Sequence, residues 1–127
     1  MIVVDASAAL SALLNDGPSR RVLASEQLHA PHLIDTEVAN GLRRQVASRT
    51  LDGDAGRATL RAWRQLGLIR HPAVGLLDRV WELRENLSAY DASYVALAEG
   101  LGCGLLTADA RLSRASGVRC AVTVVPR

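Results

Sequence analysis

Short hydrophobic runs alternate along the chain with segments in which apolar residues recur every three or four positions. The β-branched run at 2–4 is followed by an alanine- and leucine-rich stretch at 6–14, which a turn at 15–18 ends. This order predicts a strand, a helix and a turn, with Pro18 in the first turn of a second helix.

The same alternation continues to the end of the chain. Helical spacing predicts helices over residues 18–24, 33–46, 52–65, 76–86, 88–100 and 110–115. Short apolar runs predict further strands at 28–30, 68–70, 104–107 and 121–125. Strands that alternate with helices and are apolar on both faces indicate the α/β class. We expect a three-layer domain with a parallel sheet of about four to five strands, covered by helices on both faces.

The composition is that of a folded globular protein, with 49% hydrophobic and 22% charged residues. A length of 127 residues predicts a single domain over residues 1–127. No apolar run approaches the roughly 20 residues that span a bilayer, and Asp5 interrupts the first one, so a cytoplasmic location is expected. Cys103 and Cys120 lack a CxxC spacing and are expected to be free thiols.

The charge is nearly balanced but unevenly distributed, and every basic residue is an arginine. Residues 43–70 hold seven arginines against two aspartates, a local charge of +5, whereas the rest of the chain has eight arginines against eleven acids, or −3. This asymmetry favours contact with a polyanion such as nucleic acid. A solvated helical face, or a face covered by a second subunit, would explain the same arginines. The candidates for RNA contact are Arg43, Arg44, Arg61 and Arg64.

Four acids are predicted to meet at one edge of the sheet. Asp5 follows the first strand and Asp109 follows the fourth, while Glu37 and Asp91 lie in the first turns of helices. Helix N-termini and strand C-termini share an edge in a parallel sheet, and Asp5 and Asp109 become neighbours if the strand order reverses between their strands. Taken singly, Asp5, Asp91 and Asp109 could each simply cap a helix.

Clustered carboxylates repel, by about 4 kcal/mol per pair at about 4 Å and an effective dielectric constant near 20. Such a cluster calls for a cation or for protons. Oxygen ligands without His or Cys suit Mg²⁺, with Mn²⁺ as a plausible substitute, rather than Zn²⁺. The chemistry expected of such an ion is activation of water and cleavage of a phosphodiester.

Other α/β sites lack essential residues. No glycine follows the first strand, as a dinucleotide site requires, and no GxxxxGK loop occurs. Phosphoaspartyl phosphatases and receiver domains depend on a lysine, which this chain does not contain.

Four motifs, in the same order and across the whole chain, resemble the PIN-domain family, and specifically the toxins of VapBC-type toxin–antitoxin modules. They begin with the residues at 3–10 (VVDASAAL), and Glu37 lies in the second, DTEVAN at 35–40. The third is YDASYVALA at 90–98, and the fourth is LLTADARL at 105–112.

This resemblance implies a Mg²⁺-dependent endoribonuclease that cleaves RNA and inhibits translation or growth. It also implies that Asp5, Glu37, Asp91 and Asp109 bind metal, with Ser7 and Thr107 supporting them. The implied partners are a cognate VapB-like antitoxin, whose C-terminal segment covers the active edge, and a second subunit in a homodimer. Many members carry a further acid just after the fourth, where this chain has Ala110 and Arg111, so a second ion would have fewer ligands.

Two other functions remain open from the sequence. A PIN-type nuclease in RNA maturation would keep the chemistry without an antitoxin. A non-catalytic binding module would keep the acidic edge without metal dependence.

Overall fold

The computed structural model describes all 127 residues and has the expected alternation of strands and helices. The strands are β1 (Ile2–Val4), β2 (Leu28–Pro31), β3 (Leu68–His71), β4 (Gly104–Thr107) and β5 (Val122–Val124). The helices are α1 (Ala6–Leu14), α2 (Pro18–Ser25), α3 (Ile34–Ala47), α4 (Gly53–Gln65), α5 (Leu77–Glu82), α6 (Ala89–Leu101) and α7 (Ala110–Arg114), with a single 3₁₀ turn at Val74–Leu76 before α5.

The five strands form one parallel sheet in the order β3-β2-β1-β4-β5. The chain builds outward from β1 through β2 to β3, and then returns to add β4 and β5 on the other side of β1. The strand order therefore reverses between β1 and β4, which is the condition under which Asp5 and Asp109 follow neighbouring strands, and a crevice forms at the carboxyl ends of strands at such a point.

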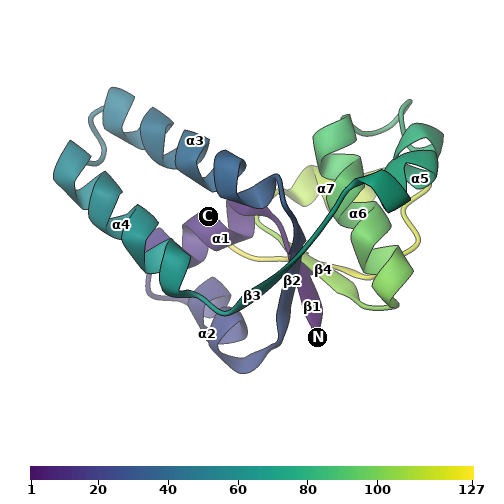
Figure 1. Cartoon of the computed structure of the whole chain (residues 1–127), viewed down its shortest axis with the longest axis horizontal. Helices are drawn as coiled ribbons and strands as arrows, with labels where there is room; N and C mark the ends of the chain where they lie inside the picture. The colour runs from purple at the N-terminus through teal and green to yellow at the C-terminus, as the bar shows by residue number, and fades with distance from the viewer.

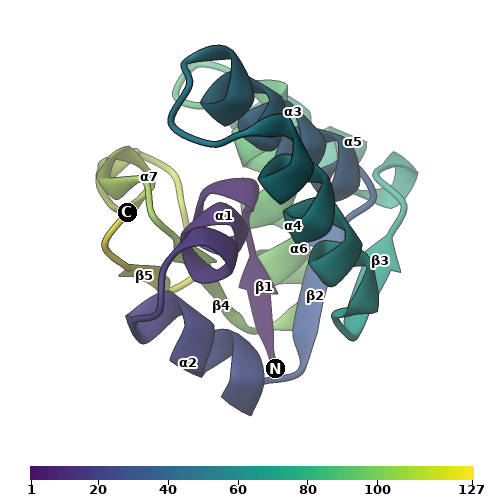
Figure 2. The same cartoon turned by 90° about the vertical axis from the view of Figure 1, so that its left-hand side faces the viewer.

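Helices cover both faces of the sheet, which confirms the predicted three-layer architecture. The first four helices lie on one side, and α5 and α6 lie on the other (Figure 1). Seen from the side in Figure 2, α1 to α4 stand in front of the strands. Helices α3 and α4 pack together and extend beyond the sheet in Figure 1.

The core lies around the central strands. Val3, Val4, Leu105 and Leu106 of β1 and β4 are fully buried. Helix α6 packs against β1, β2 and β4, and the whole run 92–98 is buried, so it needs apolar residues on nearly all sides. Edge strands β3 and β5 are only partly buried, because one side of each has no neighbour.

Helix boundaries follow their capping residues. Asp52 accepts from the amide of Ala55 at the start of α4, and Ser88 accepts from Asp91 at the start of α6. Helix α6 ends at Gly102, whose φ of 68° is the left-handed conformation that glycine adopts without strain.

The helix predicted over residues 76–86 is shorter in the structure, where α5 ends at Glu82. Beyond it the amides of Arg84 and Asn86 bond to carbonyls three residues back, so the chain tightens into turns. The physical reason is the next helix. Ser88 adopts an extended conformation in order to cap α6, and a continuous helix cannot reach that conformation.

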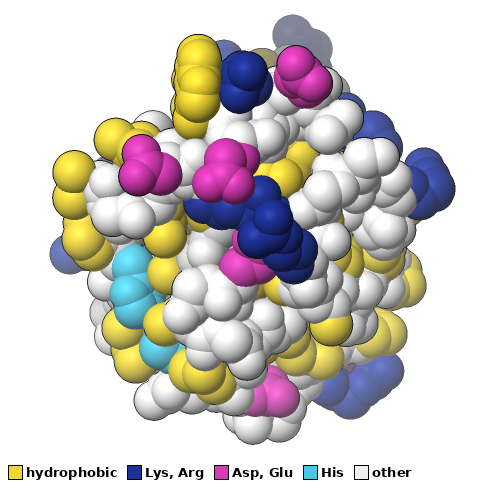
Figure 3. Space-filling model, turned by 90° about the vertical axis from the view of Figure 1, so that its right-hand side faces the viewer, with side chains coloured by type: hydrophobic (Ala, Val, Ile, Leu, Met, Phe, Trp, Pro, Cys, Tyr) yellow, Lys and Arg dark blue, Asp and Glu magenta, His cyan; other side chains and the backbone are white.

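An ion-pair network joins α5 to α6. The Arg79 guanidinium contacts Glu99 at 2.7 Å and donates to the carbonyl of Gly117 at 2.6 Å. Figure 3 shows the side of the molecule that lies on the right in Figure 1, where basic and acidic side chains touch near the centre. The network holds the short helix α5 against the rest of the molecule.

Both cysteines are free and partly buried, as expected. No helix is both long enough and apolar enough to cross a lipid bilayer.

Candidate active site

The site is built where β1 and β4 end side by side. Val4 pairs with Leu106 in the parallel register, and the amide of Asp5 donates to the carbonyl of Leu106 at 3.0 Å. The next residue on β4, Thr107, is fully buried beside Asp5. Two residues 102 positions apart in the sequence are thus fixed at the switch point of the sheet.

Asp5 is held by hydrogen bonds on both of its carboxylate oxygens. Oδ1 accepts from the Ser7 hydroxyl at 2.7 Å and from the amide of Ala8 at 2.9 Å, and Oδ2 accepts from the hydroxyl of Thr107. Burial raises the pKa of Asp5, whereas these three hydrogen bonds lower it and the nearby charge of Asp91 raises it further. Asp5 both caps α1 and faces the site. A capping role therefore does not exclude a role in the site.

Ser7 and Thr107 also organise the loop that carries Asp109. The amide of Ala108 donates to the Ser7 hydroxyl at 2.9 Å, and the amide of Asp109 donates to that of Thr107 at 3.0 Å. Both hydroxyl groups therefore link Asp5 to the segment after β4. This is the place at which the resemblance put supporting residues.

Glu37 lies in the first turn of α3 and reaches across to α6. Its Oε1 accepts a hydrogen bond from the hydroxyl of Tyr94 at 2.5 Å. Burial raises the pKa of Glu37, the Tyr94 hydroxyl lowers it, and the charges of Asp91 and Asp5 raise it. The tyrosine is buried, and its pKa is raised by burial and then by the Glu37 carboxylate that it faces. The hydroxyl therefore stays protonated and acts as a fixed donor to Glu37.

Asp91 lies in the first turn of α6, where Ser88 caps the helix. Its pKa is raised by burial and by the charge of Asp109, and lowered by Arg111. These couplings, together with those of Asp5 and Glu37 to Asp91, link all four predicted acids electrostatically. The structure thus brings them to one edge.

Asp109 differs from the other three because it is paired with a base. The Arg111 guanidinium contacts both of its carboxylate oxygens, with Nη2 at 2.6 Å from Oδ2. The hydrogen bonds and charge of Arg111 hold the pKa of Asp109 below its usual value. The Arg111 side chain is 78% exposed, so it can leave the carboxylate without exposing buried surface.

The four carboxylates fit a hard divalent cation by the chemistry of their donors. Three of them have raised pKa values, first because they are buried and then because of the neighbouring acids, and a cation would favour their charged forms. No three acidic, His or Cys side chains gather closely enough in this arrangement to coordinate one ion.

The candidate arginines are divided between two surfaces. Arg44 lines a cleft that also contains Glu37, whereas Arg43, Arg61 and Arg64 line a separate groove between α3 and α4. Neighbouring residues on a helix point about 100° apart, which explains why Arg43 and Arg44 separate. The four candidates therefore do not share one surface, because Arg44 lies apart from the other three.

Two residues near the acids had no assigned role in the sequence. Tyr94 lies three residues after Asp91 and so on the same side of α6, a spacing that could have indicated it. Arg127 follows β5 and reaches the cleft beside Ser7, and no local pattern indicates that position. Nearby, Asp35 accepts from Trp63 at 2.7 Å and pairs with Arg70, which joins the first turn of α3 to α4 and β3.

Comparison with known proteins agrees with this geometry. A protein-family model described as PIN domain matches residues 2–118. A VapC ribonuclease of Mycobacterium bovis is 60% identical over 127 residues, covering 100% of both chains.

Solved structures share the fold. A crystal structure of a Pyrobaculum aerophilum protein superposes with a TM-score of 0.73 at 26% identity, covering 95% of this chain and 81% of that one. A toxin–antitoxin complex from Klebsiella pneumoniae gives a TM-score of 0.73 at 17% identity and covers 100% of both chains. The doubly wound sheet, the acids at its switch point and a family match over nearly the whole sequence show that the chain belongs to the PIN-domain family.

Proposed function

We propose that this protein is a Mg²⁺-dependent endoribonuclease, with Mn²⁺ as a plausible substitute. The observation that carries the proposal is the placement of four carboxylates at helix starts along one edge of the sheet, with Asp5 held on both oxygens and Glu37 held by Tyr94. The ribonuclease name of a full-length relative at 60% identity supports RNA as the substrate.

Asp5, Glu37, Asp91 and Asp109 would hold the ion. When bound, the ion lowers the pKa of a water molecule and stabilises charge on the phosphate oxygens. Ser7 and Thr107 keep Asp5 in one orientation, and Tyr94 does the same for Glu37. These donors orient Asp5 and Glu37 in advance, whereas Asp109 would first have to leave Arg111.

Arg111 gives the site a counter-charge in the absence of metal. By pairing with Asp109 it offsets part of the repulsion among the acids. If Asp109 held the ion, the exposed guanidinium would be free to contact a phosphate of the substrate.

We further propose that the protein is the toxin of a type II toxin–antitoxin pair. The full-length relative carries the name VapC, and a structure with the same fold is described as a toxin–antitoxin complex. A VapB-like antitoxin would cover the acidic edge and keep the enzyme inactive. The free toxin, acting as a homodimer, would cleave RNA and stop translation or growth.

The catalytic part of the proposal is tested with variants of the acids. Asp5→Asn, Glu37→Gln, Asp91→Asn and Asp109→Asn should each lower RNA cleavage by at least about a hundredfold. Each should stay folded by circular dichroism, because removal of one like charge relieves repulsion. Asp16→Asn, an exposed acid without a partner, is the matched control. Near-full activity in any two of the four variants, or activity that survives excess chelator, would overturn the assignment.

The toxin part is tested by expression with and without the neighbouring small open reading frame. Expression alone should arrest growth and produce new RNA ends, and co-expression should suppress both effects. Cleavage without growth arrest would instead favour a nuclease of RNA maturation. Growth arrest by the acid variants would favour a binding module.

A further inference from the structure

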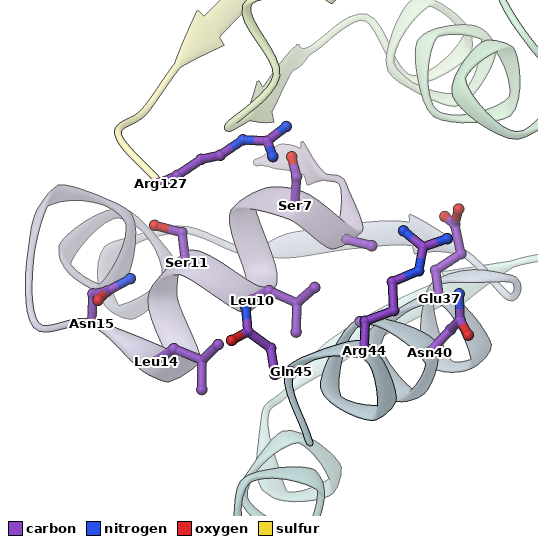
Figure 4. A pocket seen from close by; sticks show the side chains of 12 residues that line it. Ser7, Leu10, Ser11, Leu14, Asn15, Glu37, Asn40, Arg44, Gln45 and Arg127 are labelled. Atoms are coloured by element: carbon purple, nitrogen blue, oxygen red, sulfur yellow. The ribbon is translucent and has the colours of Figure 1, made fainter. Parts of the chain in front are cut away.

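A polar cleft leads away from the acidic edge between α1 and α3. Its volume is about 360 Å³, within the range of about 300–1,000 Å³ that accommodates small ligands. Ser7 and Glu37 lie at one end of it and Asn15 lies at the other, as Figure 4 shows. A molecule bound at the acids can therefore extend directly into this space.

Two arginines supply positive charge at this cleft. Arg44 comes from α3 and Arg127 from the segment after β5, and their side chains reach over the cleft from different elements (Figure 4). Neither guanidinium forms an ion pair, and only the Nε of Arg127 is engaged, by the carbonyl of Ala108 at 3.3 Å. Unpaired guanidinium groups beside an acidic site suit a ligand that carries phosphate, which they can bind through two hydrogen bonds at once.

The wall formed by α3 carries two amides in fixed orientations. The Asn40 Oδ1 accepts from Arg43 at 2.9 Å, and the Gln45 Oε1 accepts from the hydroxyl of Thr50 at 2.5 Å. Because the oxygens are engaged, each amide keeps its NH₂ group available as a donor. Such donors match the ring nitrogens and carbonyl oxygens on the edge of a nucleobase.

The floor of the cleft is apolar. Leu10 of α1 lies directly over Gly41 of α3, where a Cβ would stand 2.3 Å from the Leu10 Cδ1. The absence of a side chain at Gly41 lets α1 and α3 approach and leaves the Leu10 side chain facing the cleft (Figure 4). Leu14 continues this surface, which can support the flat face of a base.

We propose that this cleft binds an unpaired nucleotide of the RNA next to the cleaved bond, and that it sets the base preference of cleavage. Arg44 and Arg127 hold its phosphate, and the amides of Asn40 and Gln45 contact the edge of its base. A base inside a duplex has both its faces and its pairing edge occupied, so the cleft admits only a single-stranded nucleotide. This inference rests on the proposed ribonuclease function, because it assigns the cleft to the same RNA.

The first experiment measures kcat/KM on short single-stranded RNAs that differ only in the bases flanking the cut. The wild type should discriminate among bases at one flanking position. Asn40→Ala and Gln45→Ala should each reduce that discrimination by about five- to tenfold, the effect of one lost hydrogen bond. Gln45→Glu should shift the preference towards bases with an amino donor, since a carboxylate only accepts. Asn86→Ala and Gln65→Ala, exposed amides outside the cleft, are the matched controls.

The ratio of kcat/KM between RNAs that differ in one flanking base shows whether Asn40 and Gln45 recognise the base or only stabilise the fold. A variant that is only less stable loses rate equally on every substrate. Unchanged ratios in Asn40→Ala and Gln45→Ala, or a wild type without preference at either flank, would overturn the proposal.

A second experiment removes cleavage altogether. Binding of a fluorescently labelled RNA is followed by anisotropy in excess chelator, over a range of salt concentrations. Arg44→Gln and Arg127→Gln should each lower the slope of log K against log salt by about 0.7, and Arg21→Gln on α2 should leave it unchanged. Equal slopes in all variants would contradict the phosphate contacts. If binding behaves as expected but no metal restores cleavage, the proposed catalytic function fails while the cleft assignment stands.

Discussion

At the scale of single residues, the site depends on neutral groups that hold charged ones. Tyr94 is the clearest case, because its buried hydroxyl has Glu37 as its partner. The donor holds the Glu37 carboxylate in one orientation before any ion arrives. Residues of this kind can matter nearly as much as the ligands themselves.

Tyr94→Phe is therefore expected to weaken Mn²⁺ binding about tenfold and to lower kcat/KM by a similar factor. The substitution removes one oxygen and leaves the ring in the core, so the melting temperature should change little. Calorimetric titration with Mn²⁺ provides a reading that is independent of catalysis. Tyr90→Phe, at a position 65% exposed, is the control and should bind as the wild type does. Equal affinity in the two variants would remove Tyr94 from the site.

Loss of Arg111 is expected to strengthen metal binding, whereas loss of the Tyr94 hydroxyl is expected to weaken it. Arg111→Gln should strengthen Mn²⁺ binding by about two- to fivefold, because the ion no longer competes with a guanidinium for Asp109. Arg114→Gln on the same helix removes an unpaired charge and serves as the control. Weaker metal binding in Arg111→Gln would mean that the arginine helps to arrange the ligands.

Some features of the site could be predicted from the sequence, and others could not. The acids could be located from strand ends and helix starts, because parallel topology fixes which ends share an edge. The contact between Glu37 and Tyr94 joins residues 57 apart, and no local pattern reports it. The separation of Arg43 from Arg44 follows from helix geometry alone, and it could have been predicted from the sequence.

At the scale of elements, hydrophobic spacing predicted nearly every helix and strand. Caps were equally informative, because Asp52 and Ser88 stand at the helix starts that the sequence suggested. The end of α5 was predicted too late, since apolar spacing continues through residues that the structure uses as turns. Spacing reports which side chains are buried, and both a helix and a series of tight turns can bury them.

The short helix α5 is predicted to depend on the pair formed by Arg79 and Glu99. Burial raises the pKa of Glu99, but Arg79 and the amide of Arg119 outweigh it, so the net pKa lies below the usual 4.5. A depressed pKa contributes stability that is present above the usual value and lost as the pH falls through the lower one. Glu99→Gln should therefore cost about 1–3 kcal/mol of unfolding free energy at pH 7.

The pH dependence distinguishes this pair from ordinary packing. The difference between the wild type and Glu99→Gln, measured by chemical denaturation, should narrow as the pH falls below 4.5. Glu85→Gln, an exposed glutamate without a partner, should match the wild type throughout. If the loss of unfolding free energy in Glu99→Gln does not depend on pH, the stabilisation comes from the packing of the Glu99 side chain and not from its charge.

At the scale of the whole molecule, accumulated charge at one edge should couple metal binding to stability. An ion bound only by the folded state adds about 2.7 kcal/mol at a concentration a hundredfold above its Kd. For a chain of 127 residues, this corresponds to a rise in melting temperature of about 10 °C. Differential scanning fluorimetry should show this rise with Mg²⁺ and Mn²⁺, and Asp5→Asn should abolish it. A similar rise in Asp5→Asn would place the ion elsewhere.

The groove between α3 and α4 makes a separate prediction about long-range charge. It is lined by Arg43, Arg57, Arg61 and Arg64. Replacement of Arg57, Arg61 and Arg64 by Gln should lower the salt slope of RNA binding by about 2, with metal binding unchanged. Replacement of Arg21, Arg114 and Arg119 by Gln removes the same charge from other surfaces and controls for net charge. If the salt dependence of RNA binding is the same in the two triple variants, the groove does not bind RNA and is better explained as a contact with another protein.

The position of β1 at the centre of the sheet has a consequence for how the enzyme is made. Asp5 is synthesised before the Thr107 hydroxyl that fixes its second oxygen, which follows 102 residues later on β4. Until Thr107 has left the ribosome, the acids have no common edge on which to meet. If the protein is the proposed nuclease, a chain that stops before β4 should therefore be inactive.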